Sequence, residues 1–229
     1  MRRIPVIGFL FVCLIHSKAQ DGLSLEGNLG LQYTGSAPAY SLQLEGRYWF
    51  SPQWSASAGV GLWDSGIRGE WMEQVNNNTQ RFYHVSDHEV MPSLQAGLRY
   101  ERSLFSLNNR DVAFFLQGKT YLLMRKQRNT SLYQKEYSRD DAQSPYMPSS
   151  ATSGSVQGHA PPSLHAGLDL GLNYPLNEEY SIAVFYGFSN IDLFTAMRNK
   201  SLLNVDLNPW IPNPNLQSFG IGIRRYFGR

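Results

Sequence analysis

Apolar and polar residues alternate without a break from Ser163 to Tyr174. The even positions are all apolar: Leu164, Ala166, Leu168, Leu170, Leu172 and Tyr174. The odd positions are all small or polar: Ser163, His165, Gly167, Asp169, Gly171 and Asn173. Because side chains point alternately to the two faces of a strand, this pattern predicts a β-strand with one apolar and one polar face. Its length is close to the roughly 9–11 residues with which a tilted strand crosses a bilayer.

The same alternation predicts seven further strands along the chain. They are expected at residues 23–33, 40–50, 54–63, 91–101, 112–124, 180–188 and 218–227. The longer connections between strands fall at 64–89, 125–162 and 190–215. Strands joined by alternating short and long connections are typical of a meander whose first and last strands close on each other. Extra hairpins inside the long connections would raise the number of strands from eight to ten.

Soluble sandwiches and lipocalin-like barrels also contain such strands, with the apolar face turned inward. Three features favour the opposite orientation. The polar face is rich in serine and glycine, which suit a narrow interior. Aromatic residues end the strands on the apolar face, as in the girdles of membrane barrels: Tyr48, Phe50, Trp54, Tyr100, Tyr174, Tyr180 and Phe227 at one side, and Tyr33, Tyr40 and Phe188 at the other. Opposite charges balance on the polar face, at Glu26, Glu45, Glu101 and Asp169 against Arg47, Arg99, Lys119 and Arg224. The predicted fold is therefore an all-β, closed, antiparallel eight-stranded transmembrane β-barrel.

The first 19 residues are predicted to be a secretory signal peptide, with a charged start, an apolar run at 4–15 and small residues before the cleavage point. Residues 20–229 then form one barrel domain. The single cysteine, Cys13, lies within the signal, so the mature chain is expected to hold no disulfide. The net charge of +2 gives no reason to expect a nucleic-acid partner. Mean hydropathy is −0.35, as expected when half of each strand faces a polar lumen.

The signal peptide, the eight strands and a last strand that ends at Phe227 resemble the small outer-membrane barrels of the OmpX/OmpA type. The resemblance covers the mature chain and implies an integral protein of a Gram-negative outer membrane. The chain stops two residues after Phe227, so no periplasmic cell-wall-binding domain is expected. The aromatic residue is also not the final one, which departs from the usual signal for barrel insertion. No catalytic motif is matched, and no cofactor or metal is expected.

The expected function is non-catalytic: a structural protein, or one that binds a partner or lipid through its extracellular loops. The lumen is expected to be plugged by large side chains, namely Arg47, Trp49, Trp63, Arg99, Phe115 and Tyr121. A small pore is a weaker alternative. Protein partners are expected at the connections 125–162 and 190–215, and outer-membrane lipid is expected around the strands.

A lipid-modifying acyl hydrolase or transferase at the outer rim is the leading alternative. Its catalytic candidates are His165, Ser189 and Asp169, which share the lumen side of neighbouring strands. His84 and Ser86 form a second choice, and His88 on the same face would add a second imidazole for a metal. Ordinary hydrogen bonding in a lumen and in a polar loop explains the same residues without chemistry.

Three cations, Arg125, Lys126 and Arg128, follow the strand at 112–124 and are predicted to contact lipid phosphates above the outer interface. A solvated base of the loop is the alternative for them. The connection 190–215 is unusually apolar for a loop, with Leu193, Phe194, Met197, Leu202, Leu203, Val205, Leu207, Trp210 and Ile211. Such a cluster is expected either to fold over the barrel mouth or to contact a partner.

Overall fold

A computed structural model describes residues 22–33, 38–124, 126–212 and 214–227. The predicted signal peptide lies outside these described residues. Within them, no helix is long and apolar enough to cross a membrane.

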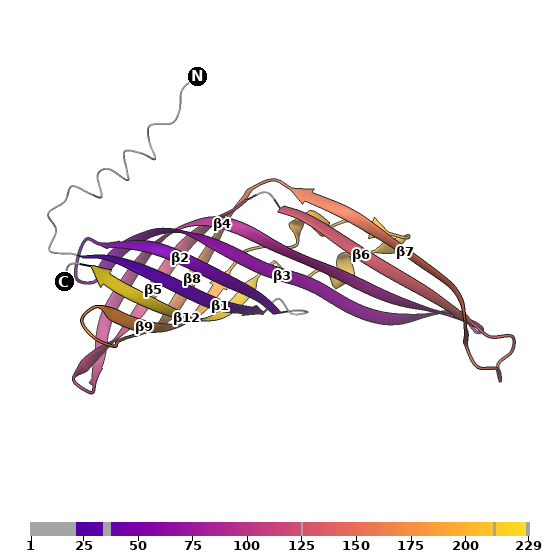
Figure 1. Cartoon of the computed structure of the whole chain (residues 1–229), viewed down its shortest axis with the longest axis horizontal. Helices are drawn as coiled ribbons and strands as arrows, with labels where there is room; N and C mark the ends of the chain where they lie inside the picture. The colour runs from indigo at the N-terminus through magenta and orange to yellow at the C-terminus, as the bar shows by residue number, and fades with distance from the viewer. Residues whose placement is uncertain (1–21, 34–37, 125, 213, 228–229) are drawn as a thin grey trace, which may run out of the picture.

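Eight strands close into an antiparallel ring in which each strand pairs with two neighbours (Figure 1). In ring order they are β1 (Leu23–Tyr33), β2 (Pro38–Trp49), β3 (Trp54–Asn76), β4 (Thr79–Leu107), β5 (Arg110–Leu123), β8 (Ser163–Pro175), β9 (Tyr180–Ser189) and β12 (Leu216–Phe227). The ladder from Leu23 opposite Phe227 to Tyr33 opposite Gln217 joins the first strand to the last. The predicted closed antiparallel barrel is therefore confirmed.

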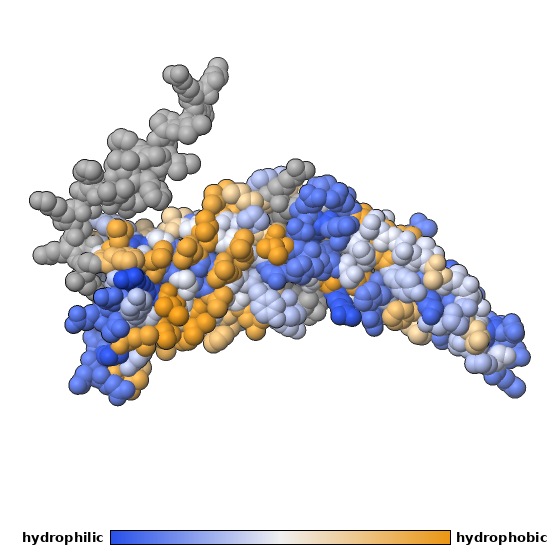
Figure 2. All heavy atoms as spheres, viewed as in Figure 1, coloured by the Kyte–Doolittle hydropathy of each residue, from blue (hydrophilic) through white to orange (hydrophobic). Residues whose placement is uncertain are grey.

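The alternation along each strand separates an apolar outside from a polar inside. In β8, Leu168 and Leu170 are 43% and 36% exposed, whereas Asp169 between them is 6% exposed. The exposed apolar side chains of the ring form a continuous belt, seen as the orange band over the barrel in Figure 2. The belt includes Leu29, Leu31, Leu42, Leu44, Val60, Leu62, Leu94, Leu98, Leu116, Leu168, Leu170, Val184, Ile221 and Ile223. An apolar surface this large on the outside of a closed barrel is suited to lipid.

Aromatic side chains lie at both borders of the belt. Trp54 and Tyr100 pack together at the end that carries the short turns, with ring centroids 5.1 Å apart. Tyr33, Tyr40 and Phe188 are exposed near the opposite border. Two such bands are typical of the interfaces of an outer-membrane barrel.

Residues 64–89 were predicted to be a polar connection, and this prediction is wrong. Strand β3 continues to Asn76 and β4 starts at Thr79, so the two form one long hairpin with its turn at 77–78. Outside the bilayer the outer face of a strand no longer needs apolar side chains, and the sequence pattern fades although the backbone ladder continues. The strand predicted at 54–63 therefore extends to Asn76, and the strand predicted at 91–101 extends from Thr79 to Leu107.

The connection 125–162 also forms a hairpin, from β6 (Lys126–Ser138) and β7 (Met147–Ala160). Strand β6 pairs with the outer part of β4, from Thr79 opposite Ser138 to Ser86 opposite Ser131. The whole sheet therefore has ten strands within the described residues, but only eight belong to the ring. The outer parts of β3 and β4 together with β6 and β7 are called the extracellular sheet below; it extends to the right of the barrel in Figure 1.

The segment 190–215, called the cap below, crosses the concave side of the extracellular sheet. It contains two short 3-10 helices, η1 (Thr195–Met197) and η2 (Asn208–Trp210), and a small hairpin of β10 (Ser201–Leu202) and β11 (Val205–Asp206). Its apolar residues share one hydrophobic cluster with the sheet and with the inner rim of the barrel. Of the two alternatives for this segment, folding over the barrel mouth is the one observed.

The lipid-facing position of Leu170 gives a depth-dependent prediction. Leu170→Arg places a charge near the middle of the belt and is expected to cost about 2–4 kcal/mol of folding free energy in lipid vesicles. Tyr174→Arg, near the border, is expected to cost only about 0–1 kcal/mol. Equilibrium unfolding of both variants in urea, from vesicles of one lipid, measures the difference. Equal losses would contradict a bilayer around β8.

Candidate functional site

The eight charged residues predicted on the polar face form one ion-pair network in the barrel interior. Its members are Glu26, Glu45, Arg47, Arg99, Glu101, Lys119, Asp169 and Arg224. Glu26 lies at the centre. Its carboxylate is 2.8 Å from Nε of Arg224 and 3.4 Å from nitrogens of both Arg47 and Arg99.

The other members extend this network along the lumen. Lys119 bridges two carboxylates, with Nζ 2.7 Å from Glu45 and 3.0 Å from Asp169. At the other end, Nη2 of Arg99 is 2.9 Å from Glu101. The four acidic and four basic groups balance, so the interior carries no net charge from them. Because the desolvation penalty of a buried ion is offset only by close partners, this pairing is what makes such a charged interior tolerable.

Large side chains occupy the space around the network. The six residues expected there, Arg47, Trp49, Trp63, Arg99, Phe115 and Tyr121, are all buried. The Arg99 guanidinium lies 3.4 Å above the centre of the Phe115 ring. A cavity of about 10 Å³ remains near the outer mouth, between Trp63, Tyr121 and Phe185. This volume is at the lower limit for one water molecule.

Arg128 connects the extracellular sheet to the cap. Its side chain is fully buried, and its Nε and Nη2 lie 2.8–3.0 Å from the two carboxylate oxygens of Asp87. Its Nη1 donates to Ser65 Oγ at 3.1 Å and to the Leu193 carbonyl at 3.0 Å. The Phe194 ring lies 4.2 Å from the guanidinium. One side chain of β6 therefore holds β3, β4 and the cap together.

These contacts correct one prediction. Arg128 does not face lipid phosphates, because its guanidinium is enclosed by protein acceptors. Arg125 and the side chain of Lys126 lie outside the described residues, so the prediction for them stays untested.

Two further contacts fix the cap. Burial alone would raise the pKa of Asp192, but hydrogen bonds from Arg198 at 2.6 Å and from the Phe194 backbone at 3.0 Å outweigh it and lower that pKa. The cap also approaches β7 closely at Gly158. A Cβ atom there would lie 2.0 Å from the Ala196 carbonyl oxygen, so only glycine permits this approach.

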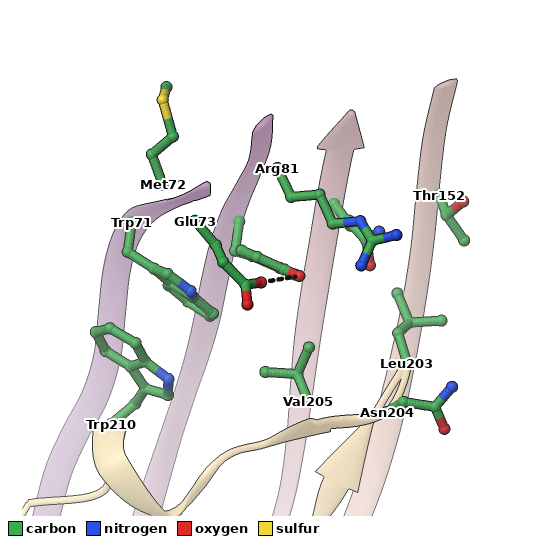
Figure 3. Close-up of a pocket in the computed structure, with 11 residues that line it drawn as sticks. Trp71, Met72, Glu73, Arg81, Thr152, Leu203, Asn204, Val205 and Trp210 are labelled. Atoms are coloured by element: carbon green, nitrogen blue, oxygen red, sulfur yellow. Dashed lines mark hydrogen bonds between the residues drawn. The ribbon is translucent and has the colours of Figure 1, made fainter. Parts of the chain in front are cut away.

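A cleft of about 800 Å³ opens between the cap and the extracellular sheet (Figure 3). Its lining comprises Trp71, Met72, Glu73, Arg81, Tyr83, Gln134, Thr152, Leu203, Asn204, Val205 and Trp210. The Trp71 ring is stacked between Trp210, at 4.0 Å, and Tyr83, at 4.7 Å. The Tyr83 hydroxyl donates to Glu73 at 2.9 Å, and Arg81 lies 2.8 Å from Glu136.

The sequence pattern did not predict this cleft. Of its lining, only Leu203, Val205 and Trp210 belong to the apolar cluster expected in the connection 190–215. The signal that was overlooked is the alternation of Ile67 and Trp71 before the turn with Tyr83 and Val85 after it, which places apolar residues on one face of a hairpin.

The catalytic candidates of the barrel rim have the following partners. His165 Nε2 lies 2.7 Å from Ser163 Oγ, and its Nδ1 lies 3.0 Å from the Asn190 carbonyl oxygen. Asp169 is ion-paired with Lys119. Ser189 stands opposite Gly167 in the ladder between β8 and β9. Ser163, two residues away on the same strand face, is thus a serine in contact with the imidazole.

The second set lies on the face of the extracellular sheet that points away from the cap. His84 Nδ1 is 2.9 Å from Glu70, and His88 Nε2 is 2.7 Å from Asp64. Ser86 and His84 line a shallow surface hollow with residues of β6 and β7. Among the described residues, no group of three or more histidine, cysteine, aspartate or glutamate side chains is arranged to hold a metal ion.

The central position of Glu26 predicts a large effect of its neutralisation. Glu26→Gln leaves three buried arginines short of one carboxylate and is expected to cost about 3–5 kcal/mol of unfolding free energy. Glu179→Gln is the matched control, because that carboxylate is exposed and lies 3.7 Å from Arg225; it is expected to change stability by less than about 0.5 kcal/mol. Urea unfolding in vesicles, followed by tryptophan fluorescence, measures both. Similar small losses would show that the network is not structurally required.

The Arg128 contacts predict that the cap opens when they are removed. Arg128→Met keeps the apolar stem but loses every hydrogen bond, so amide hydrogen exchange in the cap is expected to rise at least about tenfold, while exchange in β8 and β12 stays unchanged. Arg139→Met, at the far tip of the sheet, is the control and should leave the cap protected. Unchanged protection in Arg128→Met would mean that the hydrophobic cluster alone holds the cap.

No protein-family model and no curated protein sequence matches the chain. Solved structures similar to it include Neisserial surface protein A, with 12% identity over 91% of this chain and 98% of that chain and a TM-score of 0.45. CarO of Acinetobacter baumannii has 12% identity over 89% and 97% of the two chains, with a TM-score of 0.42. Ail, the attachment invasion locus protein of Yersinia pestis, has 15% identity over 90% and 97%, with a TM-score of 0.29.

The closed ring, the apolar belt, the aromatic borders and the charged interior are together the features of a transmembrane β-barrel. The chain folds as a small, closed β-barrel of this kind.

Proposed function

We propose that the protein is a non-catalytic outer-membrane binding protein, whose barrel is closed by its own side chains and carries a rigid extracellular sheet for a partner. The observation that carries the proposal is the fixation of the cap. The hydrophobic cluster and Arg128 pack the cap into the sheet, so that contacts within the chain itself hold the residues around the cleft. Such preorganisation lowers the entropic cost of binding.

The exposed residues of the sheet support an interaction role. Tyr133 and Met147 are 39% and 62% exposed, and Met72 is 59% exposed. Arg139 stacks on Tyr146 at the tip. Tyrosine, methionine and arginine are enriched in protein interfaces. The β6–β7 hairpin, within the connection for which a partner was expected, is the proposed contact region for a protein partner. Outer-membrane lipid is the proposed surrounding of the belt.

A pore is disfavoured by the filled interior. The ion pairs around Glu26 and the rings of Phe115 and Trp49 occupy the lumen, and the remaining cavity near the mouth is about 10 Å³. We therefore expect no stable conductance from the purified protein in planar bilayers. Reproducible single-channel currents that disappear when the protein is omitted would contradict the closed lumen.

Photo-crosslinking in intact cells tests the binding role. A photoreactive phenylalanine analogue at Tyr133 or Met147 is expected to give discrete crosslinked products, whereas the same analogue at Phe219, in the lipid belt, is expected to give none with protein. The absence of products from both extracellular positions would reject the β6–β7 hairpin as a contact region.

The contact between Ser163 and His165 favours one second candidate, an acyl hydrolase at the outer rim. The imidazole is placed to accept the Ser163 proton, while its other nitrogen faces a backbone carbonyl in place of a carboxylate. Mass spectrometry of the lipid A of cells with and without the gene distinguishes the two functions. Acylation that changes with the gene and reverts in Ser163→Ala would establish the hydrolase.

A further inference from the structure

The cleft between cap and sheet has a floor that is made of complete strand ladders. Strands β3, β4, β6 and β7 pair in this order, so no unpaired backbone edge lies within the floor; the two edges of the row are the outer part of β3, beyond Ser65, and β7. A partner strand therefore cannot add to the floor of the cleft by backbone hydrogen bonds, as peptide ligands do at a free sheet edge. Recognition in the cleft has to come from side chains.

One wall of the cleft is aromatic. Trp71 is clamped between Trp210 and Tyr83, which come from the cap and from β4 (Figure 3). The stack covers both faces of Trp71, and Tyr83 is only 3% exposed, so the partly exposed Trp210 is the ring of the three that is left to contact a ligand with its face. Aromatic residues of this kind offer flat apolar surface together with N–H and O–H groups at their edges.

The opposite side is polar and mixes donors with acceptors. Gln134 and Asn204 carry amides and Thr152 carries a hydroxyl, while the Glu73 carboxylate lies on the aromatic side, next to Tyr83. Burial, together with the hydrogen bond to Glu73, raises the pKa of Tyr83, so the phenol stays a donor. Groups that donate and accept side by side suit hydroxyl ligands, because a hydroxyl does both.

The charged groups of the lining favour a neutral or cationic ligand. The lining holds one carboxylate, Glu73, which accepts from the neutral Tyr83 hydroxyl, and one guanidinium, Arg81, which is already paired with Glu136 at 2.8 Å. A sulfated, phosphorylated or uronic-acid ligand would have to compete with Glu136 for Arg81, whereas a neutral sugar or an ammonium group would not.

We propose that this cleft binds a short neutral or amino-sugar oligosaccharide, with the apolar face of one sugar against Trp210 and hydroxyl or ammonium groups on Glu73, Gln134 and Asn204. The volume of about 800 Å³ lies within the range of about 300–1,000 Å³ found for ligand sites. This inference rests on the proposed binding function and names its ligand class.

Titration of the full-length protein in nanodiscs tests the proposal. The probes are maltotriose, tri-N-acetylchitotriose, chitotriose (the trisaccharide of glucosamine) and a heparin-derived hexasaccharide. Calorimetry and tryptophan fluorescence are the readouts. One or more of the first three is expected to bind and to change the fluorescence, and the heparin fragment is expected to bind at least tenfold more weakly.

Two variants on one strand provide the matched comparison. Glu73→Gln removes the carboxylate that points into the cleft and is expected to weaken binding at least tenfold. Glu70→Gln alters the same residue type on the opposite face, where Glu70 pairs with His84, and is expected to change binding less than twofold. Trp210→Ala is expected to abolish binding, and hydrogen exchange of the cap shows whether that variant is still folded.

Several outcomes overturn the proposal: no binding of any of the three uncharged or cationic probes, tightest binding of the heparin fragment, or equal effects of Glu73→Gln and Glu70→Gln. Competition by vesicles that contain lipopolysaccharide would support the site and assign its sugar to the membrane itself. If the trisaccharides fail while crosslinks at Tyr133 persist, the oligosaccharide site is rejected and the proposed binding function stands.

Discussion

Closure of the ring is the constraint on which the rest of this structure depends. In lipid every backbone N–H and C=O has to be paired within the protein, and only a sheet whose first and last strands meet achieves this. The ladder between β1 and β12 supplies that closure. Closure then determines which side chains face inward, because every second residue of each strand must point into the interior. An interior enclosed by eight strands is narrow. A polar interior of this size is stable only when its charges are paired, and Glu26 with its three arginines is the centre of that pairing.

The part of the fold outside the membrane is built on the same strand ladders, but there the outer face of the strands meets water in place of lipid. Strands β3 and β4 continue as a hairpin, because their backbone pairs regardless of what surrounds the sheet. Their outer face no longer needs to be apolar, while the inner face stays apolar under the cap. Arg128 is buried where barrel, sheet and cap meet, and its hydrogen bonds to Asp87 and to the Leu193 carbonyl tie the cap to the sheet. This attachment of the cap is the reason for proposing a binding role.

The sequence predicted the membrane part of the fold closely. Every ring strand except β3 and β4 begins and ends within two residues of the prediction, because lipid on one side and a polar lumen on the other impose a strict alternation. The charged residues of the lumen were found for the same reason. The extracellular sheet was missed, since water on its outer face removes that alternation. Arg128 was misplaced because its partner Asp87 is 41 residues away and nothing local indicates the contact. The cleft could not be predicted from the sequence, because its lining comes from four strands and the cap, which are far apart along the chain.

The most direct test of this account is a nitroxide scan along β8 from Leu164 to Tyr174, with the protein folded in lipid vesicles. The account predicts that even positions are accessible to oxygen, most of all near Leu168 and Leu170, while odd positions such as Asp169 are protected from it. The alternation should continue through the whole strand without a change of phase. Even positions that are shielded from both oxygen and water would show that the apolar face packs against protein, and the barrel would then not be a membrane barrel.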